Sequence, residues 1–222
     1  MSRKRGAWLG VLLASFWLGG CATGERTEVQ RLQARASYER GLGHLERREA
    51  ALALTAIQEA ISLDDTVPVY WNALGWLYLQ LGRPDLALGP FTRATQLDTT
   101  YAEAQLNIGV TLAEMSRWED ALAAYRKAVS LPTLPTPHTA YQNMGVALYN
   151  LKRYREAEEA LRFAVSLEPT LDAAYYHLGL VLLAQERRDD AKSAFRRARD
   201  LAPQSPFGRA AVGQLRALGE GG

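Results

Sequence analysis

A repeat with a period of about 34 residues constrains the fold of this chain more than any other feature of its sequence. Glycines recur at that spacing, and two series of alanines accompany them along the chain. The three series are Gly41, Gly75, Gly109, Gly145 and Gly179; Ala53, Ala87, Ala121, Ala157 and Ala191; and Ala60, Ala94, Ala128, Ala164 and Ala198. Each series keeps one step throughout, except between its third and fourth members, where the step is longer by two. A fixed period shared by three series predicts a stack of similar supersecondary units.

Both halves of each unit have apolar residues at helical spacing, which predicts a pair of amphipathic helices per unit. The second unit resembles the tetratricopeptide repeat. Its signature reads Trp71-x-x-Leu74-Gly75-x-x-Tyr78, then Ala87-x-x-x-Phe91, then Ala94. The small residues Gly75 and Ala87 are expected where the two helices cross, because a larger side chain there would force the backbones apart.

The resemblance implies an all-α fold, a right-handed superhelix (solenoid) of five tetratricopeptide helix–turn–helix repeats. The expected repeats are residues 34–67, 68–101, 102–137, 138–171 and 172–205. Because one repeat cannot bury its own apolar face, neighbouring repeats must stack. Residues 206–222 are expected to form a capping helix, which covers the open end of the stack, and a short tail.

The first twenty residues predict a secretory signal peptide. Ser2-Arg3-Lys4-Arg5 is a basic start, and the thirteen-residue apolar run from Gly6 to Leu18 is shorter than the ~20 residues that cross a bilayer. The run ends in Leu18-Gly19-Gly20-Cys21, which resembles the lipobox of bacterial lipoproteins. That resemblance implies cleavage before Cys21 and attachment of a diacylglycerol to its sulfur. The alternative is a plain signal peptide followed by a chance cysteine, the only one in the chain.

A diacylglycerol would supply the two acyl chains that stable membrane attachment requires. The next residue is Ala22, not the aspartate that resembles an inner-membrane retention signal, which implies the periplasmic face of the outer membrane. Residues 21–33 would then form the lipidated cysteine and a mostly polar tether. Removal of residues 1–20 leaves 23 basic and 24 acidic residues, so charge gives no argument for nucleic-acid binding.

In tetratricopeptide proteins the first helix of each repeat lines the concave face, which implies a partner-binding stripe at matching register positions. The stripe comprises Tyr38, Leu42, Leu45, Val69, Asn72, Trp76, Leu79, Leu106, Val110, Ala113, Gln142, Val146, Tyr149, Tyr176, Leu180 and Leu183. Exposed apolar patches mark interaction sites, and tryptophan and tyrosine are favoured anchors. The alternative is that some of these side chains pack against neighbouring helices.

Three asparagines, Asn72, Asn107 and Asn143, lie on or beside the stripe. An amide both donates and accepts hydrogen bonds, so these side chains could hold an extended backbone in register. The alternative is a surface polar residue or a hydrogen bond between helices.

The irregular spacing arises in Leu131-Pro132-Thr133-Leu134-Pro135-Thr136-Pro137-His138, where three prolines predict a stiff, extended connection. The alternative is a tolerated loop insertion. Here the chain also resembles the lipoproteins that assemble the type IV pilus secretin, the pilotins of the PilF, PilW and Tgl kind. Those are signal-anchored tetratricopeptide arrays with a proline-containing insertion between two central repeats. The matching segments are Leu134-Pro135-Thr136-Pro137 and Tyr141-Gln142-Asn143-Met144-Gly145.

This narrower resemblance implies a lipid-anchored scaffold that binds secretin subunits at the outer membrane and promotes their multimerisation. Confinement to two dimensions would raise the effective concentration of the subunits. Two alternatives are a scaffold for another envelope complex, such as β-barrel assembly or peptidoglycan enzymes, and a carrier of a small apolar ligand.

Catalysis is not expected. His44, His138 and His177 fall in different repeats without metal-ligand spacing, and the sequence contains no zinc-protease, phosphate-loop or nucleophile-elbow motif. We therefore expect no enzyme activity, cofactor or metal. Charged runs such as Glu46-Arg47-Arg48-Glu49 are interpreted as solvated turns.

Overall fold

The computed structural model describes residues 27–220, and all regular secondary structure in that range is helical. The prediction of an all-α superhelix of helix–turn–helix repeats is confirmed. The helices are α1 (Glu28–Glu46), α2 (Ala50–Leu63), α3 (Pro68–Gln80), α4 (Pro84–Leu97), α5 (Ala102–Glu114), α6 (Trp118–Val129), α7 (Pro137–Asn150), α8 (Tyr154–Leu167), α9 (Asp172–Ala184), α10 (Arg188–Leu201) and α11 (Pro206–Ala217).

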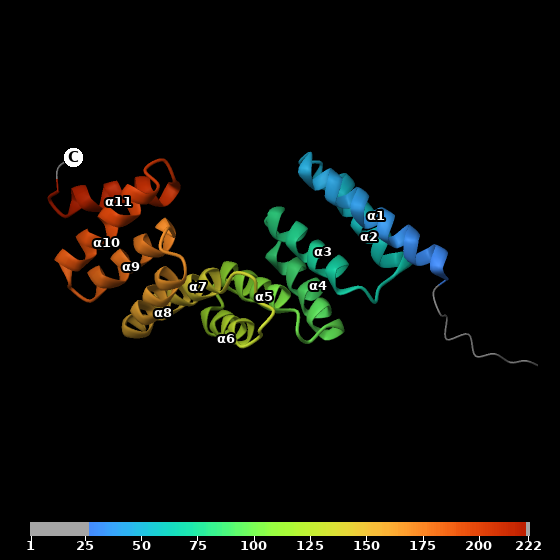
Figure 1. The fold of residues 1–222 in the computed structure, drawn as a ribbon, viewed down its shortest axis with the longest axis horizontal. Coiled ribbons are helices and arrows are strands. Elements are labelled where there is room, and N and C mark those ends of the chain that lie inside the picture. The colour runs from blue at the N-terminus through green and yellow to red at the C-terminus, as the bar shows by residue number, and fades with distance from the viewer. Residues whose placement is uncertain (1–26, 221–222) are drawn as a thin grey trace, which may run out of the picture.

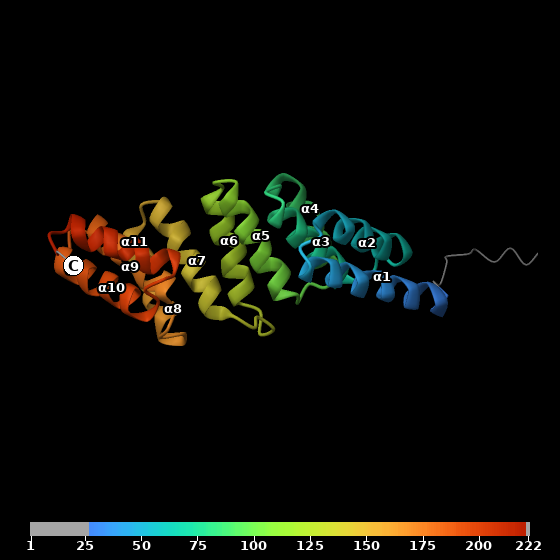
Figure 2. The same ribbon diagram turned by 90° about the horizontal axis from the view of Figure 1, so that it is seen from above.

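The helices follow one another along an arch, with α1 and α11 at its two ends (Figures 1 and 2). Each odd-numbered helix from α1 to α9 packs against the next helix in the chain, and each even-numbered helix then packs against the following repeat. In addition, α3 contacts α5, α5 contacts α7, and α7 contacts α9. These direct contacts between first helices place them on the inner, concave side of the arch.

Small residues set the distance between the two helices of a repeat, as predicted. A Cβ added at Gly75 would lie 2.8 Å from ring carbon Cδ1 of Phe91, and one added at Gly179 would lie 2.5 Å from ring carbon Cε1 of Phe195. Ala87 is completely buried beside the first of these crossings. The helices therefore approach as closely as a backbone without a side chain allows.

The large side chains that fill these crossings form a further periodic series, which the sequence interpretation did not single out. They are Ile57, Phe91, Tyr125, Leu161 and Phe195, all among the largest fully or almost fully buried residues. Their spacing follows that of the glycines, with the longer step again between the third and fourth members. Each repeat thus buries one large side chain of its second helix against the glycine of its first helix.

The turns within the repeats share one backbone conformation. Arg48, Gly82, Ser116, Lys152 and Glu186 all have positive φ angles, between 58° and 66°. At the end of α3, the backbone N–H of Arg83 donates to the carbonyl oxygen of Tyr78, and that of Gly82 donates to Leu79, both at 2.9 Å. This pattern is the Schellman motif, which ends a helix with one left-handed residue.

The first helix begins earlier than the predicted tether allows. Residues 28–33 belong to α1, because Thr27 and Gln30 form a capping box that supplies partners for the first backbone N–H groups. The tether prediction is therefore wrong for these residues. The signal peptide and Cys21 lie outside the described residues.

The proline-containing connection between α6 and α7 is held against the preceding repeat. The Thr133 hydroxyl donates a hydrogen bond to the carbonyl oxygen of Thr100, in the turn between α4 and α5. Leu134 packs against a cluster of buried residues from α5, α6 and α7 that includes Leu106, Leu112 and Tyr125, which we call the central core cluster. The two additional residues are therefore accommodated by a connection with its own anchoring contacts.

Helix α11 packs against α9 and α10 at the C-terminal end of the array. Its N-terminus is capped by the Ser205 side chain, which accepts a 2.9 Å hydrogen bond from the backbone N–H of Gly208. In the part of the chain that the structure describes, no helix combines the length and the hydropathy needed to cross a membrane.

Candidate functional site

The concave face contains a hollow between the first three odd-numbered helices, which we call the N-terminal hollow. Its volume is about 470 Å³, within the range of small-molecule and side-chain binding pockets. The lining residues are Leu42, Leu45, Glu46, Asn72, Ala73, Trp76 and Glu103. They come from α1, α3 and α5, so three repeats build this single site.

Trp76 is the most exposed aromatic side chain of the predicted stripe. It is 42% exposed, although it lies mid-helix among buried neighbours such as Leu74 and Leu77. Leu42, on α1, is 36% exposed and lines the same hollow. An exposed indole beside exposed leucine leaves apolar area uncovered, which a partner could bury.

A second hollow lies between α5, α6 and α7, and we call it the central hollow. Its volume is about 270 Å³. The lining residues are Val110, Ala113, Glu114, Trp118, Tyr125, Asn143 and Val146. Four of them, Val110, Ala113, Asn143 and Val146, belong to the residues predicted on or beside the binding stripe, so the structure brings them together.

Two of the three asparagines bond to neighbouring helices. The Asn107 amide donates a 3.1 Å hydrogen bond to the side-chain oxygen of Asn72, and the Asn72 amide donates at 3.4 Å to a carboxylate oxygen of Glu103. This is the alternative considered for these residues, a link between helices. Asn143 makes no side-chain hydrogen bond to any described residue, so its amide is available to a bound backbone.

The remaining stripe residues differ in accessibility. Leu106 is only 7% exposed and belongs to the central core cluster, so its placement on a contact surface is corrected. Asn72 is also buried, at 7% exposed, although it lines the N-terminal hollow. Val69 is exposed. The half-buried members are Tyr38, Leu45, Leu79, Asn107, Val110, Ala113, Gln142, Asn143, Val146, Tyr149, Tyr176, Leu180 and Leu183.

Towards the C-terminus the stripe is partly covered by other side chains. The Tyr176 ring lies 5.8 Å from the Phe195 ring and 5.8 Å from the Phe207 ring of α11. The Tyr149 ring lies 5.7 Å from the Tyr154 ring. It also packs against the buried residues of the C-terminal repeats, among them Leu161, Leu182 and Phe195, which we call the C-terminal core cluster. These aromatic residues have the packing role that was the alternative to binding, and the exposed apolar area is concentrated in the N-terminal half.

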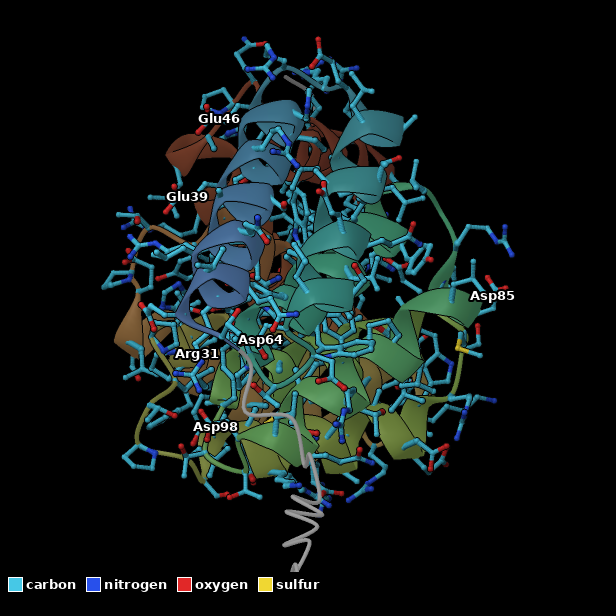
Figure 3. All side chains as sticks on the ribbon, turned by 90° about the vertical axis from the view of Figure 1, so that its right-hand side faces the viewer. Arg31, Glu39, Glu46, Asp64, Asp85 and Asp98 are labelled. Carbon is cyan, nitrogen blue, oxygen red and sulfur yellow. The ribbon has the colours of Figure 1, made fainter. Side chains whose placement is uncertain are left out.

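Two carboxylates of the site, Glu46 and Glu103, were not among the binding residues predicted from the sequence. Glu46 was interpreted as part of a solvated turn, yet it lines the N-terminal hollow together with Glu103. Viewed from the N-terminal end of the array, Glu46 and Glu39 project from the side of α1 that faces away from α2 (Figure 3). The available signal was helical periodicity, because Glu46 follows Leu42 by four residues and shares its helix face.

The negative charge of Glu103 affects two tyrosines near the N-terminal hollow. Burial raises the pKa of Tyr101 to about 12, and the Glu103 carboxylate acts in the same direction. Burial is also the main cause of the raised pKa of Tyr38, to which Tyr70 and Glu103 contribute. Both phenols therefore stay neutral and can only donate or accept hydrogen bonds.

Within residues 27–220, no three histidine, cysteine, aspartate or glutamate side chains are grouped as metal ligands would be. His44, in the last turn of α1, has its Nδ1 atom 2.6 Å from the Oε2 atom of Glu49, in the turn that follows. His177 packs edge-on against Phe207, with ring centroids 5.4 Å apart. The two histidines thus have separate local contacts at opposite ends of the array.

Comparison with known proteins agrees with this architecture. A model of the tetratricopeptide repeat matches residues 38–102, 72–135 and 143–206, more than half of the chain. The small glutamine-rich tetratricopeptide repeat-containing protein 2 of Mycosarcoma maydis is 27% identical over 84 residues. That match covers 38% of this chain and 24% of the relative, so the chain spans about a quarter of the relative's length.

Three solved structures share the fold over most of their length. MamA has a TM-score of 0.68 and 23% identity, covering 78% of this chain and 93% of MamA. PilW, a widely conserved type IV pilus biogenesis factor, has a TM-score of 0.71 and 20% identity, and the match covers 86% of this chain and 94% of PilW. PilF of Pseudomonas aeruginosa has a TM-score of 0.69 and 20% identity, and the match covers 88% of this chain and 96% of PilF. The predicted resemblance to PilF and PilW is confirmed at the level of the fold.

Proposed function

The chain belongs to the tetratricopeptide repeat family, and from that premise we propose that it is a lipid-anchored scaffold at the periplasmic face of the outer membrane, where it promotes multimerisation of the type IV pilus secretin. Members of this family are protein-binding scaffolds. The secretin partner, the lipid anchor and the outer-membrane location are the parts of the proposal that go beyond the family.

The observation that carries the binding role is the exposed Trp76 over the N-terminal hollow. Tryptophan supplies a large apolar area at a small cost in side-chain entropy, and such residues dominate the energetics of protein interfaces. A hollow built from three repeats also offers a concave surface to a side chain of the partner. An exposed aromatic side chain beside a concave apolar surface is sufficient for binding a protein segment.

Two observations support a pilus partner. PilW, which is described as a type IV pilus biogenesis factor, and PilF both resemble this chain over nearly their whole length. The proline-containing connection between α6 and α7, the basis of the sequence resemblance, is anchored through Thr133 and Leu134. An anchored connection has a defined shape, which a tolerated insertion does not require.

The anchor rests on the lipobox residues Leu18 to Cys21. Because α1 begins at Glu28, only six residues separate Cys21 from the first helix. Six residues span at most ~20 Å. A lipid on Cys21 would therefore keep the array close to the membrane surface, where confinement raises the effective concentration of anchored partners.

Deletion of the gene tests the proposal directly. We expect heat-resistant secretin multimers to disappear from outer-membrane extracts and to return when the wild-type gene is supplied. Persisting multimers together with normal pili would reject the secretin assignment. In that case, loss of other β-barrel proteins or of normal peptidoglycan would point to the alternative, a scaffold for another envelope complex.

A further inference from the structure

We propose that the N-terminal hollow binds an extended segment of the partner in which lysine or arginine alternates with apolar side chains. This inference rests on the proposed function, because it assigns the chemistry of the segment that the scaffold binds. It follows from the distribution of charge between the two faces of the array.

The inner helices after α1 contain no lysine or arginine, a property shared by α3, α5, α7 and α9. By contrast, the outer helix α10 alone contains five, and α6 and α8 also contain basic residues. In α1, the arginines Arg31, Arg35 and Arg40 are each paired with a glutamate. Beyond α1, the basic residues of the repeats therefore lie on the second helices and the turns. One of them, Arg48, lines a separate hollow that Trp76 also borders, whereas the residues that line the N-terminal hollow itself are apolar, acidic or amide side chains.

Two carboxylates converge on the exposed tryptophan. Glu46 from α1 and Glu103 from α5 both line the hollow that contains Trp76 of α3. Neither forms an ion pair with a residue in the described range, and the only hydrogen bond of the Glu103 side chain comes from the Asn72 amide. Both charges are thus uncompensated within the site.

The same chemistry recurs further along the array. Glu114 lines the central hollow and is at the register position of Glu46, two repeats later. It too has no ion pair among the described residues. A ligand that follows the concave face would therefore meet carboxylates at intervals, separated by apolar surface.

This arrangement selects for a basic and apolar ligand. A partner that covered the hollow would remove water from both carboxylates, which costs free energy unless an opposite charge replaces it. A lysine or arginine supplies that charge, and its aliphatic stem can pack on Leu42 and Leu45. Its charged end can also interact with the face of Trp76.

Binding of short labelled peptides to the full chain, purified in a non-ionic detergent, tests the inference. Three peptides share fixed leucines and differ only in whether the intervening residues are lysine, glutamine or glutamate. At low salt we expect the lysine peptide to bind about five- to tenfold more tightly than the glutamine peptide, as a pair of exposed ion pairs would give. We expect the glutamate peptide to bind most weakly and the preference to shrink in high salt.

Charge-neutralising variants locate the effect. The double variant Glu46→Gln, Glu103→Gln should remove the preference for lysine, while glutamine retains an acceptor for the Asn72 amide. The matched control is Glu159→Gln on α8, which changes an exposed carboxylate on an outer helix and should leave the preference intact. Circular dichroism of each variant verifies the fold.

Equal binding of all three peptides, a preference for glutamate, or no binding of the lysine peptide would each overturn the inference. Retention of the lysine preference in the double variant would also overturn it, because the charges would act elsewhere. None of these results alters the outcome of the gene deletion. The secretin assignment therefore fails only if multimers persist, and the two proposals can be rejected independently.

Discussion

Gly109 lies directly against the Tyr125 ring, so closely that a Cβ on the glycine would be 2.4 Å from ring carbons Cδ1 and Cε1. The two residues lie on the two helices of one repeat. The same separation along the chain joins the glycine of every repeat to a large buried side chain of its second helix. The other pairs are Gly41 and Ile57, Gly75 and Phe91, Gly145 and Leu161, and Gly179 and Phe195.

Replacing Gly109 by alanine should destabilise the array. Tyr125 is fully buried and cannot move aside without disturbing the core, so overpacking should cost about 1–3 kcal/mol. The midpoint of urea unfolding, followed by circular dichroism, measures the effect. Gly89→Ala is the matched control, because a Cβ added at Gly89 would meet no neighbouring atom within 4 Å. It should leave the midpoint unchanged or raise it, since alanine is the better helix former by up to ~1 kcal/mol. A similar effect of both substitutions would contradict the packing argument.

The left-handed turns predict opposite effects for two reciprocal substitutions. Ser116 has a φ angle of 58° and Gly82 one of 66°, at equivalent turns of adjacent repeats. Because a side chain in this region costs about 1 kcal/mol or more, Ser116→Gly should raise the unfolding midpoint and Gly82→Ala should lower it. The same urea titration measures both. A lower midpoint for Ser116→Gly would show that the serine side chain contributes more than the backbone strain it imposes.

Much of this fold could be predicted because the sequence repeats it five times. The recurring glycines and alanines reveal where backbones must approach, and that requirement is met at Gly75 and Ala87. The start of α1 could not be placed by the repeat, since the capping box of Thr27 and Gln30 precedes the first repeat unit. Local capping chemistry, rather than periodicity, determines that boundary.

The candidate site was less predictable because register does not specify what covers a residue. Leu106 occupies a stripe position but packs into the core, and Tyr176 is partly covered by Phe207 of a helix outside the repeats. The bond between Asn72 and Asn107 joins side chains of different repeats. Such relationships depend on how the repeats stack, which the sequence of one repeat does not contain.

Trp76→Ala should weaken partner binding without lowering stability much. The indole is 42% exposed, so its removal deletes contact area for a partner while opening little cavity in the core. Loss of an aromatic anchor of this kind typically costs about 2 kcal/mol or more, roughly a thirtyfold loss of affinity. A quantitative pull-down of the secretin measures it. Leu52→Ala is the control, because Leu52 is 53% exposed on the outer helix α2 and should be neutral. Equal binding by wild type and Trp76→Ala would remove the hollow from the interface.

Tyr149→Asp is expected to combine two effects. The ring is half-buried and packs against Tyr154 and the C-terminal core cluster, so a carboxylate there loses apolar contacts as well as any contact with a partner. We expect weaker partner binding together with a lower unfolding midpoint. Tyr149→Phe preserves the packing and separates the two, since it should restore the midpoint to that of the wild type. A wild-type midpoint for Tyr149→Asp would show that the ring's packing contributes little.

Stability should fall between pH 7 and pH 5 because of His177. Burial lowers the pKa of this side chain from 6.5 to about 4, and its ring packs against Tyr176 and Phe207. As the pH falls through 6.5, the unfolded chain binds a proton that the folded chain does not bind until about pH 4. The free energy of unfolding should therefore decrease by about 2 kcal/mol from pH 7 to pH 5 through this residue alone.

The variant His177→Phe isolates that contribution, because it preserves an aromatic ring at the contact with Phe207 and removes the titrating group. Urea midpoints at pH 7 and pH 5 should differ less in this variant than in the wild type. Carboxylates such as Glu49 and Glu156 have lowered pKa values in the folded chain. They also lower the stability at lower pH, because there the unfolded chain binds protons that the folded carboxylates do not yet bind. An unchanged pH dependence in His177→Phe would show that folding does not shift the pKa of His177 and would reject this prediction.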